Sequence, residues 1–289
     1  MTGTGGTAPA GAVRSVRLPD GEAVPALGQG TWGMAEDGRR RKYEVAALRL
    51  GLDLGLTLID TAELYADGGA EELVAEALAG RRDEVFLVTK VLPENATRRG
   101  TLAACDRSLR RLQTDRLDLY LLHWRGRHPL EGTVRAFLEL VEVGKIRHWG
   151  VSNFDVPDME DLVGLPGGSN VATDQVLYNL TRRGIEVGLL PWCEQRELPV
   201  MAYSPIEQGR LLDHPALEAV ASRHEATAAQ IALAWVLRRV DVIAIPKAGS
   251  AEHVRENRRA LEMQLSWDDL AELDRAFPPP MEPRPLEIL

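Results

Sequence analysis

The chain has 289 residues, of which 45% are hydrophobic and 27% are charged, and its formal net charge is −9. These fractions are those of an ordinary globular protein, and the negative charge argues against a nucleic-acid-binding protein, because phosphate backbones attract basic surfaces. A phosphorylated cofactor is not excluded, since one local basic pocket is enough to bind it.

The amino-terminal segment, MTGTGGTAPAGA, has neither an apolar core nor a basic start, so it lacks the features of a secretion signal. We expect residues 1–12 to form a flexible tail before a single domain over residues 13–289. That domain should open with a small hairpin, because Asp20-Gly21 in VRSVRLPDGEAVPAL is a strong turn signal.

From residue 26 onward, short apolar runs alternate with helix-like segments. The runs are ALGQGTW, LTLID, VFLVTK, LDLYLLH, IRHWGVSN, VATDQ, PVMAYS and VIAIPK. Helical spacing appears between them, for example over residues 42–55, 70–80, 101–113, 132–144 and 227–239. The nearly continuous apolar runs are typical of strands covered on both sheet faces. Together they predict an α/β fold, the (β/α)8 TIM barrel, with extra helical and tail segments at its C-terminal end, the Pro-rich tail lying over the barrel.

Two cysteines are present, Cys105 and Cys193. Cys105 lies in a segment with helical apolar spacing, which predicts a buried free thiol and no disulfide framework, so we expect a cytoplasmic protein. The uncharged runs, such as ATAAQIALAWVL, are shorter than the ~20 residues that a membrane-spanning helix needs, so no membrane partner is expected.

The segment GQGTWG at residues 28–33 matches the G-x-G-x-x-G pattern of a dinucleotide-binding fold, and Asp53 follows about 20 residues further on. In that fold the last glycine opens a helix directly, whereas here the polar, glycine-broken MAEDGRRRK intervenes. Asp53 also lies within a helical pattern and not at the end of a strand. A Rossmann dehydrogenase is therefore an alternative that rests on this motif alone.

Active sites of (β/α)8 barrels lie at the carboxyl ends of the strands. The polar residues that close the predicted strands follow one another at intervals of about one βα unit, so they should face one cavity. They are Asp60, Lys90, His123, Asn153, Gln175, Tyr203 and Lys247. Tyr65 follows Asp60 in the next loop and should lean over the same cavity.

Four of these residues suggest acid catalysis. Asp60 and Lys90 lie on neighbouring strands and should form an ion pair, although singly an Asp can cap a turn and a Lys can be a solvated charge. A Lys cation beside Tyr65 favours the tyrosinate, so we expect it to lower the pKa of Tyr65 from about 10 toward the working range. Tyr65 could then give a proton to a carbonyl oxygen that His123 holds by a hydrogen bond.

A metal site is the alternative for HWRGRH, which carries His123 and His128. This segment is a predicted loop with two arginines and no matching carboxylate, so no metal is expected. The remaining histidines show no ligand spacing: His148, His214, His224 and His253.

Several long segments, in the same order, resemble those of the aldo-keto reductase superfamily over nearly the whole chain. LIDTAELY resembles the segment with that family's Asp and Tyr, and VFLVTK and LDLYLLHW resemble those with its Lys and His. The resemblance implies catalytic roles for Asp60, Tyr65, Lys90 and His123. It also implies direct hydride transfer from NADPH to an aldehyde or ketone, without a metal, with Tyr65 as the general acid.

The resemblance extends to the cofactor site. GKIRHWGVSNF and ATDQVLYN resemble the segments that hold the nicotinamide carboxamide, and VMAYSP resembles the segment whose tyrosine stacks on the nicotinamide ring. IPKAGSAEHVREN resembles the segment that holds the adenosine phosphate and the adenine. The cofactor-binding residues implied in this way are Thr31, Trp32, Ser152, Asn153, Gln175, Tyr203, Ser204, Lys247, Ser250, His253, Glu256 and Asn257.

Two departures concern the cofactor and the substrate. Where many members have Ser after the phosphate-binding Lys and Arg six positions after that Lys, this chain has Ala248 and His253, which removes a hydroxyl and a permanent charge. NADPH is still expected in preference to NADH. The loops WRGRHPL and SPIEQGRLLDHP are short, so we expect an open site, with Trp32 and Trp124 as apolar walls of the substrate pocket.

The expected function is NADPH-dependent reduction of small aldehydes, ketones and α-dicarbonyls such as methylglyoxal to alcohols. The resemblance is strongest to bacterial methylglyoxal and 2,5-diketogluconate reductases, and it implies a monomer. The alternative is a cofactor-binding redox sensor or interaction module on the same barrel, with slow turnover and tight cofactor retention. All four catalytic positions are occupied and no partner-binding extension is visible, which favours the enzyme.

Overall fold

A computed structural model describes residues 13–289, and the tail predicted over residues 1–12 lies outside the described residues. Eight parallel strands pair in chain order from β3 to β10. The Gly28 N–H donates to the Ala244 carbonyl and the Ala244 N–H donates to the Ala26 carbonyl, both at 2.8 Å. The first and last strands are therefore also joined, and the sheet closes into the predicted (β/α)8 barrel.

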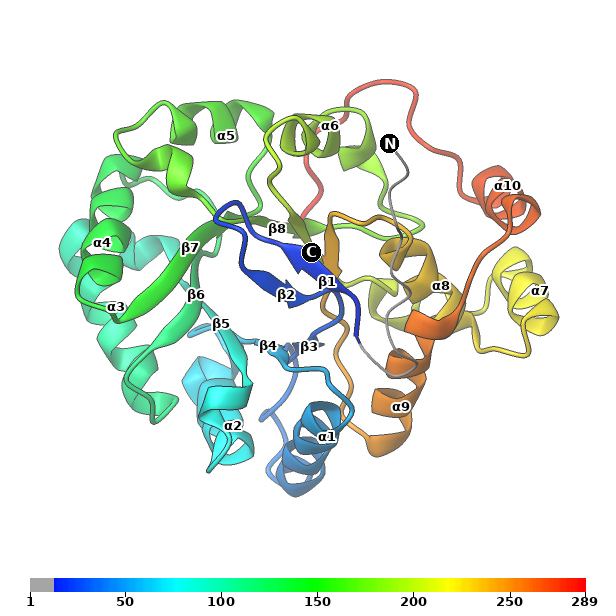
Figure 1. Ribbon diagram of the computed structural model, residues 1–289, viewed down its shortest axis with the longest axis horizontal. Coiled ribbons are helices and arrows are strands. Elements are labelled where there is room, and N and C mark those ends of the chain that lie inside the picture. The colour runs from blue at the N-terminus through cyan, green and yellow to red at the C-terminus, as the bar shows by residue number, and fades with distance from the viewer. Residues whose placement is uncertain (1–12) are drawn as a thin grey trace, which may run out of the picture.

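The helices surround the strands as a ring (Figure 1). The strands of the barrel are β3 (Gln29–Gly30), β4 (Leu58–Asp60), β5 (Phe86–Val91), β6 (Leu117–Leu122), β7 (Ile146–Ser152), β8 (Asp174–Leu177), β9 (Val200–Tyr203) and β10 (Val242–Ala244). The helices are α1 (Arg41–Asp53), α2 (Gly69–Leu78), α3 (Arg98–Arg111), α4 (Leu130–Glu142), α5 (Val156–Val163), α6 (Leu189–Glu194), α7 (Pro215–Arg223), α8 (Ala228–Leu237), α9 (Ala251–Arg259) and α10 (Trp267–Ala276).

The core lies inside the barrel and between the barrel and the helices. All six residues of β5 and all six of β6 are buried, as expected of strands covered on both faces. On the outer side, Phe137 of α4 stacks on Trp149 of β7 with 5.4 Å between ring centroids and meets Tyr120 of β6 edge-on at 5.6 Å. These contacts explain why the apolar runs of the sequence contain few charges.

A hairpin of β1 (Ser15–Arg17) and β2 (Ala23–Pro25) crosses the centre of the barrel in Figure 1. The Arg14 guanidinium donates to the carbonyls of Leu237 and Arg239, at 3.0 and 2.9 Å, just before β10 begins. Glu22 pairs with Arg147, at the start of β7, at 2.6 Å. The predicted hairpin therefore covers the amino-terminal end of the barrel, away from the carboxyl ends of the strands.

The segment after α10 crosses the opposite end of the barrel. Glu287 pairs with Arg182, which follows β8, at 2.6 Å. The Leu289 N–H lies 3.4 Å from the hydroxyl of Tyr203, the last residue of β9. The Pro-rich tail thus lies over the carboxyl ends of the strands, as predicted.

The strand boundaries differ from the expected ones in two places. The run predicted at residues 171–175 is β8 at Asp174–Leu177, so Gln175 lies inside the strand and does not close it. The cause is the buried Val176 and Leu177, which prolong the apolar run past the glutamine. At the other end, β10 stops at Ala244, but an isolated parallel bridge joins Gly30 to Lys247.

Two further observations concern the cysteines and the helices. Cys105 is a buried free thiol, as predicted, and Cys193 is also free and buried. Over residues 13–289, none of the helices combines the length and the apolar character that crossing a bilayer requires.

Candidate active site

Lys90 is the centre of a buried polar cluster at the carboxyl end of the barrel. Its ammonium nitrogen lies 2.8 Å from both carboxylate oxygens of Asp60 and 2.8 Å from the Thr61 carbonyl oxygen. The same nitrogen lies 3.1 Å from the Tyr65 hydroxyl oxygen. The Lys90 side chain is 0% exposed and that of Asp60 is 3% exposed. The Asp60–Lys90 ion pair expected from neighbouring strands is therefore present and fully enclosed.

The pKa values in this cluster determine which group carries the proton. Burial lowers the pKa of Lys90, but the attraction of Asp60 and Tyr65 outweighs it, so the pKa lies above its ordinary value. Burial raises the pKa of Tyr65, and the nearby Lys90 charge offsets only part of that rise. The expectation that Lys90 would lower the pKa of Tyr65 toward the working range is therefore wrong. Tyr65 is a protonated phenol beside a charged ammonium at neutral pH.

A tight turn after β4 points Tyr65 into the site. Ala66 and Asp67 both adopt left-handed backbone conformations, with φ of 49° and 52°, and Gly68 follows with φ of 88°. A side chain at Gly68 would collide with Arg111, since its Cβ would lie 2.6 Å from Arg111 Cδ. Left-handed non-glycine residues are strained and gather at functional sites, so this turn holds the tyrosine at an energetic cost.

His123 lies beside Tyr65 at the end of β6. The two ring centroids are 5.7 Å apart, and the Trp124 ring is 4.9 Å from the imidazole. Burial, together with the Lys90 charge, lowers the pKa of His123 to about 2, so the ring is neutral throughout the physiological range. Its Nδ1 is buried and has no hydrogen-bond partner among residues 13–289. The arrangement leaves a neutral imidazole beside the phenol.

Gln175 connects β8 to the same cluster. Its amide nitrogen donates to Asp60 Oδ1 at 2.8 Å and lies 2.9 Å from the Met201 sulfur. Ser152 is its register partner on β7, and the serine hydroxyl donates to the Gln175 carbonyl at 2.7 Å. Two residues expected on the nicotinamide carboxamide therefore lie side by side at the barrel mouth.

Asn153 and Tyr203 form a second pair at the strand ends. Asn153 is left-handed, with φ of 59°, and its amide nitrogen donates to the His123 carbonyl at 3.1 Å. The Tyr203 hydroxyl donates to Asn153 Oδ1 at 2.9 Å. Ser204, the next residue, is also left-handed, with φ of 46°. The ends of β7 and β9 are thus held together across β8.

Aromatic side chains border the opening. Thr31 is buried, and its hydroxyl donates to the Asp60 carbonyl at 3.0 Å, which places Trp32 at the rim. Trp32 is 53% exposed and meets the Tyr65 ring edge-on at 5.1 Å. Trp124 is partly exposed beside His123. Both tryptophans expected as walls therefore lie next to the polar cluster.

The remaining predicted cofactor residues lie apart from the cluster, on α9 and in the loop before it. Lys247 and His253 are exposed, Glu256 is partly exposed and Asn257 is buried. Ser250 precedes the helix, and its hydroxyl accepts a hydrogen bond from the His253 N–H at 3.3 Å. The structure gives this group no contact with the Lys90 cluster, so the predicted residues form two separate groups.

Glu63 was not singled out in the sequence, although it lies between Asp60 and Tyr65. It is 9% exposed, and its Oε1 accepts hydrogen bonds from the Leu92 N–H at 2.8 Å and from Asn95 Nδ2 at 2.9 Å. These bonds tie the turn that carries Tyr65 to the loop after β5. Its position between Asp60 and Tyr65 was the one feature of the sequence that could have indicated Glu63.

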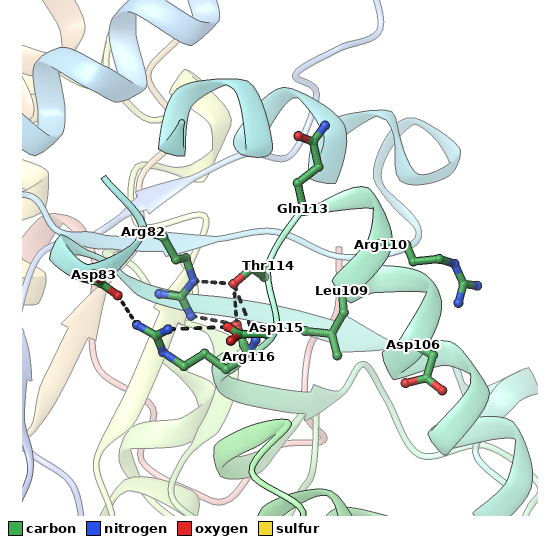
Figure 2. A pocket seen from close by; sticks show the side chains of 9 residues that line it. All are labelled: Arg82, Asp83, Asp106, Leu109, Arg110, Gln113, Thr114, Asp115 and Arg116. Carbon is green, nitrogen blue, oxygen red and sulfur yellow. Dashed lines mark hydrogen bonds and ion pairs between the residues drawn. The ribbon is translucent and has the colours of Figure 1, made fainter. Parts of the chain in front are cut away.

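Two other polar groupings lie at the amino-terminal end of the barrel. Figure 2 shows a hollow before β5 and β6, where Arg116 pairs with Asp83 and Arg82 Nε donates to Thr114 at 3.1 Å. In the part of the chain that the structure describes, the cluster that could hold a metal is Asp20, Glu22 and His148, not His123 and His128. Glu22 there already binds His148 directly at 2.6 Å.

Comparison with known proteins gives a consistent result. Residues 26–277 match a family model described as the aldo/keto reductase family. Methylglyoxal reductase YeaE of Escherichia coli is 55% identical over 272 residues, covering 92% of this chain and 96% of that protein. Glyoxal reductase of Bacillus subtilis is 34% identical over 260 residues, covering 90% and 91%. An aldo/keto reductase of Klebsiella pneumoniae, solved with NADP and acetate, has a TM-score of 0.94 at 54% identity, covering 96% of this chain and all of that one.

Proposed function

The chain belongs to the aldo/keto reductase family, and on that basis we propose that it reduces small aldehydes, ketones and α-dicarbonyls, methylglyoxal among them, with NADPH. One observation carries the proposal. The Tyr65 hydroxyl oxygen faces the buried Lys90 ammonium at 3.1 Å, and no acceptor among the described residues takes the hydroxyl proton. A proton donor is thus held beside a fixed positive charge at the mouth of the barrel.

The residues present fit an extended dinucleotide cofactor. Lys247 is exposed and has no carboxylate partner within residues 13–289, as suits a cation that meets a phosphate. At the other end, hydroxyl and amide side chains meet at neighbouring strand ends. We assign the cofactor to Thr31, Trp32, Ser152, Asn153, Gln175, Tyr203, Ser204, Lys247, Ser250, His253, Glu256 and Asn257. When bound, NADPH supplies the hydride that reduces the carbonyl carbon.

Tyr65 acts as the general acid of the reduction. Its raised pKa keeps the phenol protonated, so a proton is available for the carbonyl oxygen. The Lys90 ammonium then stabilises the phenolate that is left, because it already lies at hydrogen-bond distance. Asp60 keeps Lys90 charged and oriented. Solvent returns the proton to Tyr65 after the alcohol leaves.

His123 positions the carbonyl oxygen. A neutral imidazole can hydrogen-bond that oxygen without placing a second positive charge beside Lys90. Trp32 and Trp124 supply apolar walls around an open site, which suits compact carbonyl compounds. The methylglyoxal reductase and glyoxal reductase names of two relatives support the same substrate class.

The proposal extends to the cellular compartment and the oligomeric state. We assign the protein to the cytoplasm, because Cys105 and Cys193 are free thiols, as a reducing compartment maintains them. We treat it as a monomer, as expected of the family.

The test is NADPH consumption by the purified chain with methylglyoxal, glyoxal and a bulky steroid ketone. Rapid turnover of the two small dicarbonyls and little of the steroid is expected. A faster steroid reaction would overturn the substrate class. Negligible turnover of a whole aldehyde panel, together with slow release of bound NADPH, would favour the redox sensor instead.

A further inference from the structure

Three consecutive arginines, Arg39, Arg40 and Arg41, lie at the start of α1, and they differ in their partners. Arg39 pairs with Asp37 at 2.9 Å, and Arg41 pairs with Glu76 at 2.7 Å. Arg40 lies between them, with its side chain 56% exposed. Its nearest carboxylate is that of Glu44, at 3.8 Å, the long limit of an ion pair. One cation of this run is therefore left largely without compensation.

Arg40 points toward the loop before α9. A Cβ built on Gly249 would lie 3.2 Å from Arg40 Nη2 and 3.4 Å from Lys247 Nζ. The Lys247 side chain has no hydrogen bond or ion pair to any residue between 13 and 289. Two cations from opposite ends of the chain thus converge on one glycine, with no carboxylate between them. Like charges that face the same point repel each other unless an anion lies between them.

The position of Arg40 is set before any ligand arrives. Arg40 is the residue that precedes α1, and its carbonyl accepts the N–H of Glu44 at 3.0 Å. The buried Glu44 carboxylate also accepts the Ala35 N–H at 3.0 Å, which fixes the preceding loop. Helices α1 and α9 lie side by side in Figure 1. The two cations are therefore held on packed elements and not on free termini.

We propose that Arg40 and Lys247 together bind the 2′-phosphate of NADPH. Arg40 would supply the permanent charge that His253 does not provide, and its guanidinium suits a phosphate that carries nearly two negative charges. Because Gly249 has no side chain, none lies between the two cations that the phosphate would join. This inference rests on the proposed NADPH-dependent function and assigns a residue that selects NADPH over NADH.

The test is calorimetric binding of 2′,5′-ADP and 5′-AMP, which differ only in the 2′-phosphate, to the full chain. Arg40→Gln is expected to weaken 2′,5′-ADP binding about tenfold and to leave 5′-AMP binding unchanged. Arg39→Gln removes the same charge one residue away and is expected to change neither. Equal losses for both nucleotides, or no loss for either, would overturn the inference.

A second variant tests the location. Adding His253→Arg to Arg40→Gln restores a permanent charge at the start of α9 and is expected to recover most of the lost 2′,5′-ADP affinity. No recovery would mean that the phosphate lies elsewhere and would contradict the assignment. Failure of the parent chain to bind NADPH at all would instead reject the proposed function, so the two failures are distinguishable.

Discussion

The two ends of the proposed cofactor site each contain a lysine, but one lysine is buried and paired and the other is exposed and unpaired. At the barrel mouth, Lys90 is fully buried and bonded to Asp60, Thr61 and Tyr65. In the loop before α9, Lys247 is exposed and has no ion-pair partner in the described part of the chain. One cation is compensated by the protein itself, and the other is left for a ligand.

This difference separates chemistry from recognition. A buried charge that is already paired keeps a fixed position and does not need to reorganise during the reaction. An exposed, unpaired cation contributes little until an anion arrives, and it can then discriminate between ligands with and without that anion. Variants at the mouth should therefore change turnover and stability, and variants at α9 should change only affinity.

The largest effect is expected for Tyr65→Phe, which keeps the ring and removes the acid. We expect kcat/KM for methylglyoxal to fall about 10²- to 10⁴-fold, because the proton then has no positioned donor. NADPH affinity should stay within about twofold, since the ring still fills its place. The exposed Tyr43→Phe serves as a control and should behave as the parent.

The pH dependence of kcat/KM in the parent also tests the role of Tyr65 as the general acid. Because burial raises the pKa of Tyr65, the acid form persists into the alkaline range, and kcat/KM should fall only above about pH 10. Because the pKa of His123 is lowered to about 2, the imidazole should add no acidic limb. A rate change centred near pH 6.5 would show that His123 titrates and would contradict its neutral role.

Lys90→Met should give the largest loss of stability. The change leaves the buried Asp60 carboxylate with the Gln175 amide as its side-chain partner, and breaking a buried pair in this way costs about 3–5 kcal/mol of unfolding free energy. Urea unfolding measures the loss. Adding Asp60→Asn to the variant removes the orphaned charge and should recover most of it.

Arg41→Met is the matched control, because Arg41 and Glu76 form an exposed pair with 31% and 51% of their side chains accessible. Its loss should stay below about 1 kcal/mol. If Lys90→Met and Arg41→Met lowered the free energy of unfolding equally, the proposed difference between a buried and an exposed ion pair would be wrong.

The sequence predicted the barrel and the mouth cluster well because both depend on local patterns. An apolar run that ends in a polar residue marks a strand end, and parallel strands bring such ends together. That reasoning located Asp60, Lys90 and His123. It misplaced Gln175, because the apolar run continues through Val176 and Leu177.

Other features could not be read from local patterns. The pKa of Tyr65 depends on a balance between lost hydration and the Lys90 charge, and the sequence indicates the charge but not the depth of burial. The approach of Arg40 to Lys247 joins distant parts of the chain. Ion pairing also separates Arg40 from its neighbours Arg39 and Arg41, which have the same side chain.

A smaller effect is expected at the open end. Lys247→Ala should raise the Kd for NADPH about tenfold and change the unfolding free energy by less than about 0.5 kcal/mol, because the side chain makes no contact that folding requires. Lys42→Ala removes another exposed lysine, on α1, and should leave the Kd unchanged. An unaltered Kd in Lys247→Ala would contradict the assignment of Lys247 to the cofactor site.

The smallest effect is expected for Asp174, a buried carboxylate that, unlike Asp60, has no lysine partner. Asp174 neighbours Gln175 on β8 and is fully buried, yet neither carboxylate oxygen has a hydrogen-bond partner among the described residues. Burial therefore raises its pKa well above the ordinary value, and the charges of Asp158 and Asp155 raise it further. Asp174 therefore shows that burial raises the pKa of a carboxyl group when no lysine is paired with it.

Since its pKa is higher in the folded than in the unfolded chain, Asp174 binds its proton more tightly in the folded state. Its contribution to stability is complete below about pH 4 and is lost as the pH rises through the folded-state pKa. Asp174→Asn removes this titration, so the unfolding free energy of the variant should rise relative to that of the parent between pH 5 and pH 8. Urea unfolding at both pH values measures the difference. The exposed Asp213→Asn should show no such gain, and a constant difference between parent and Asp174→Asn would mean that the carboxyl does not titrate with folding.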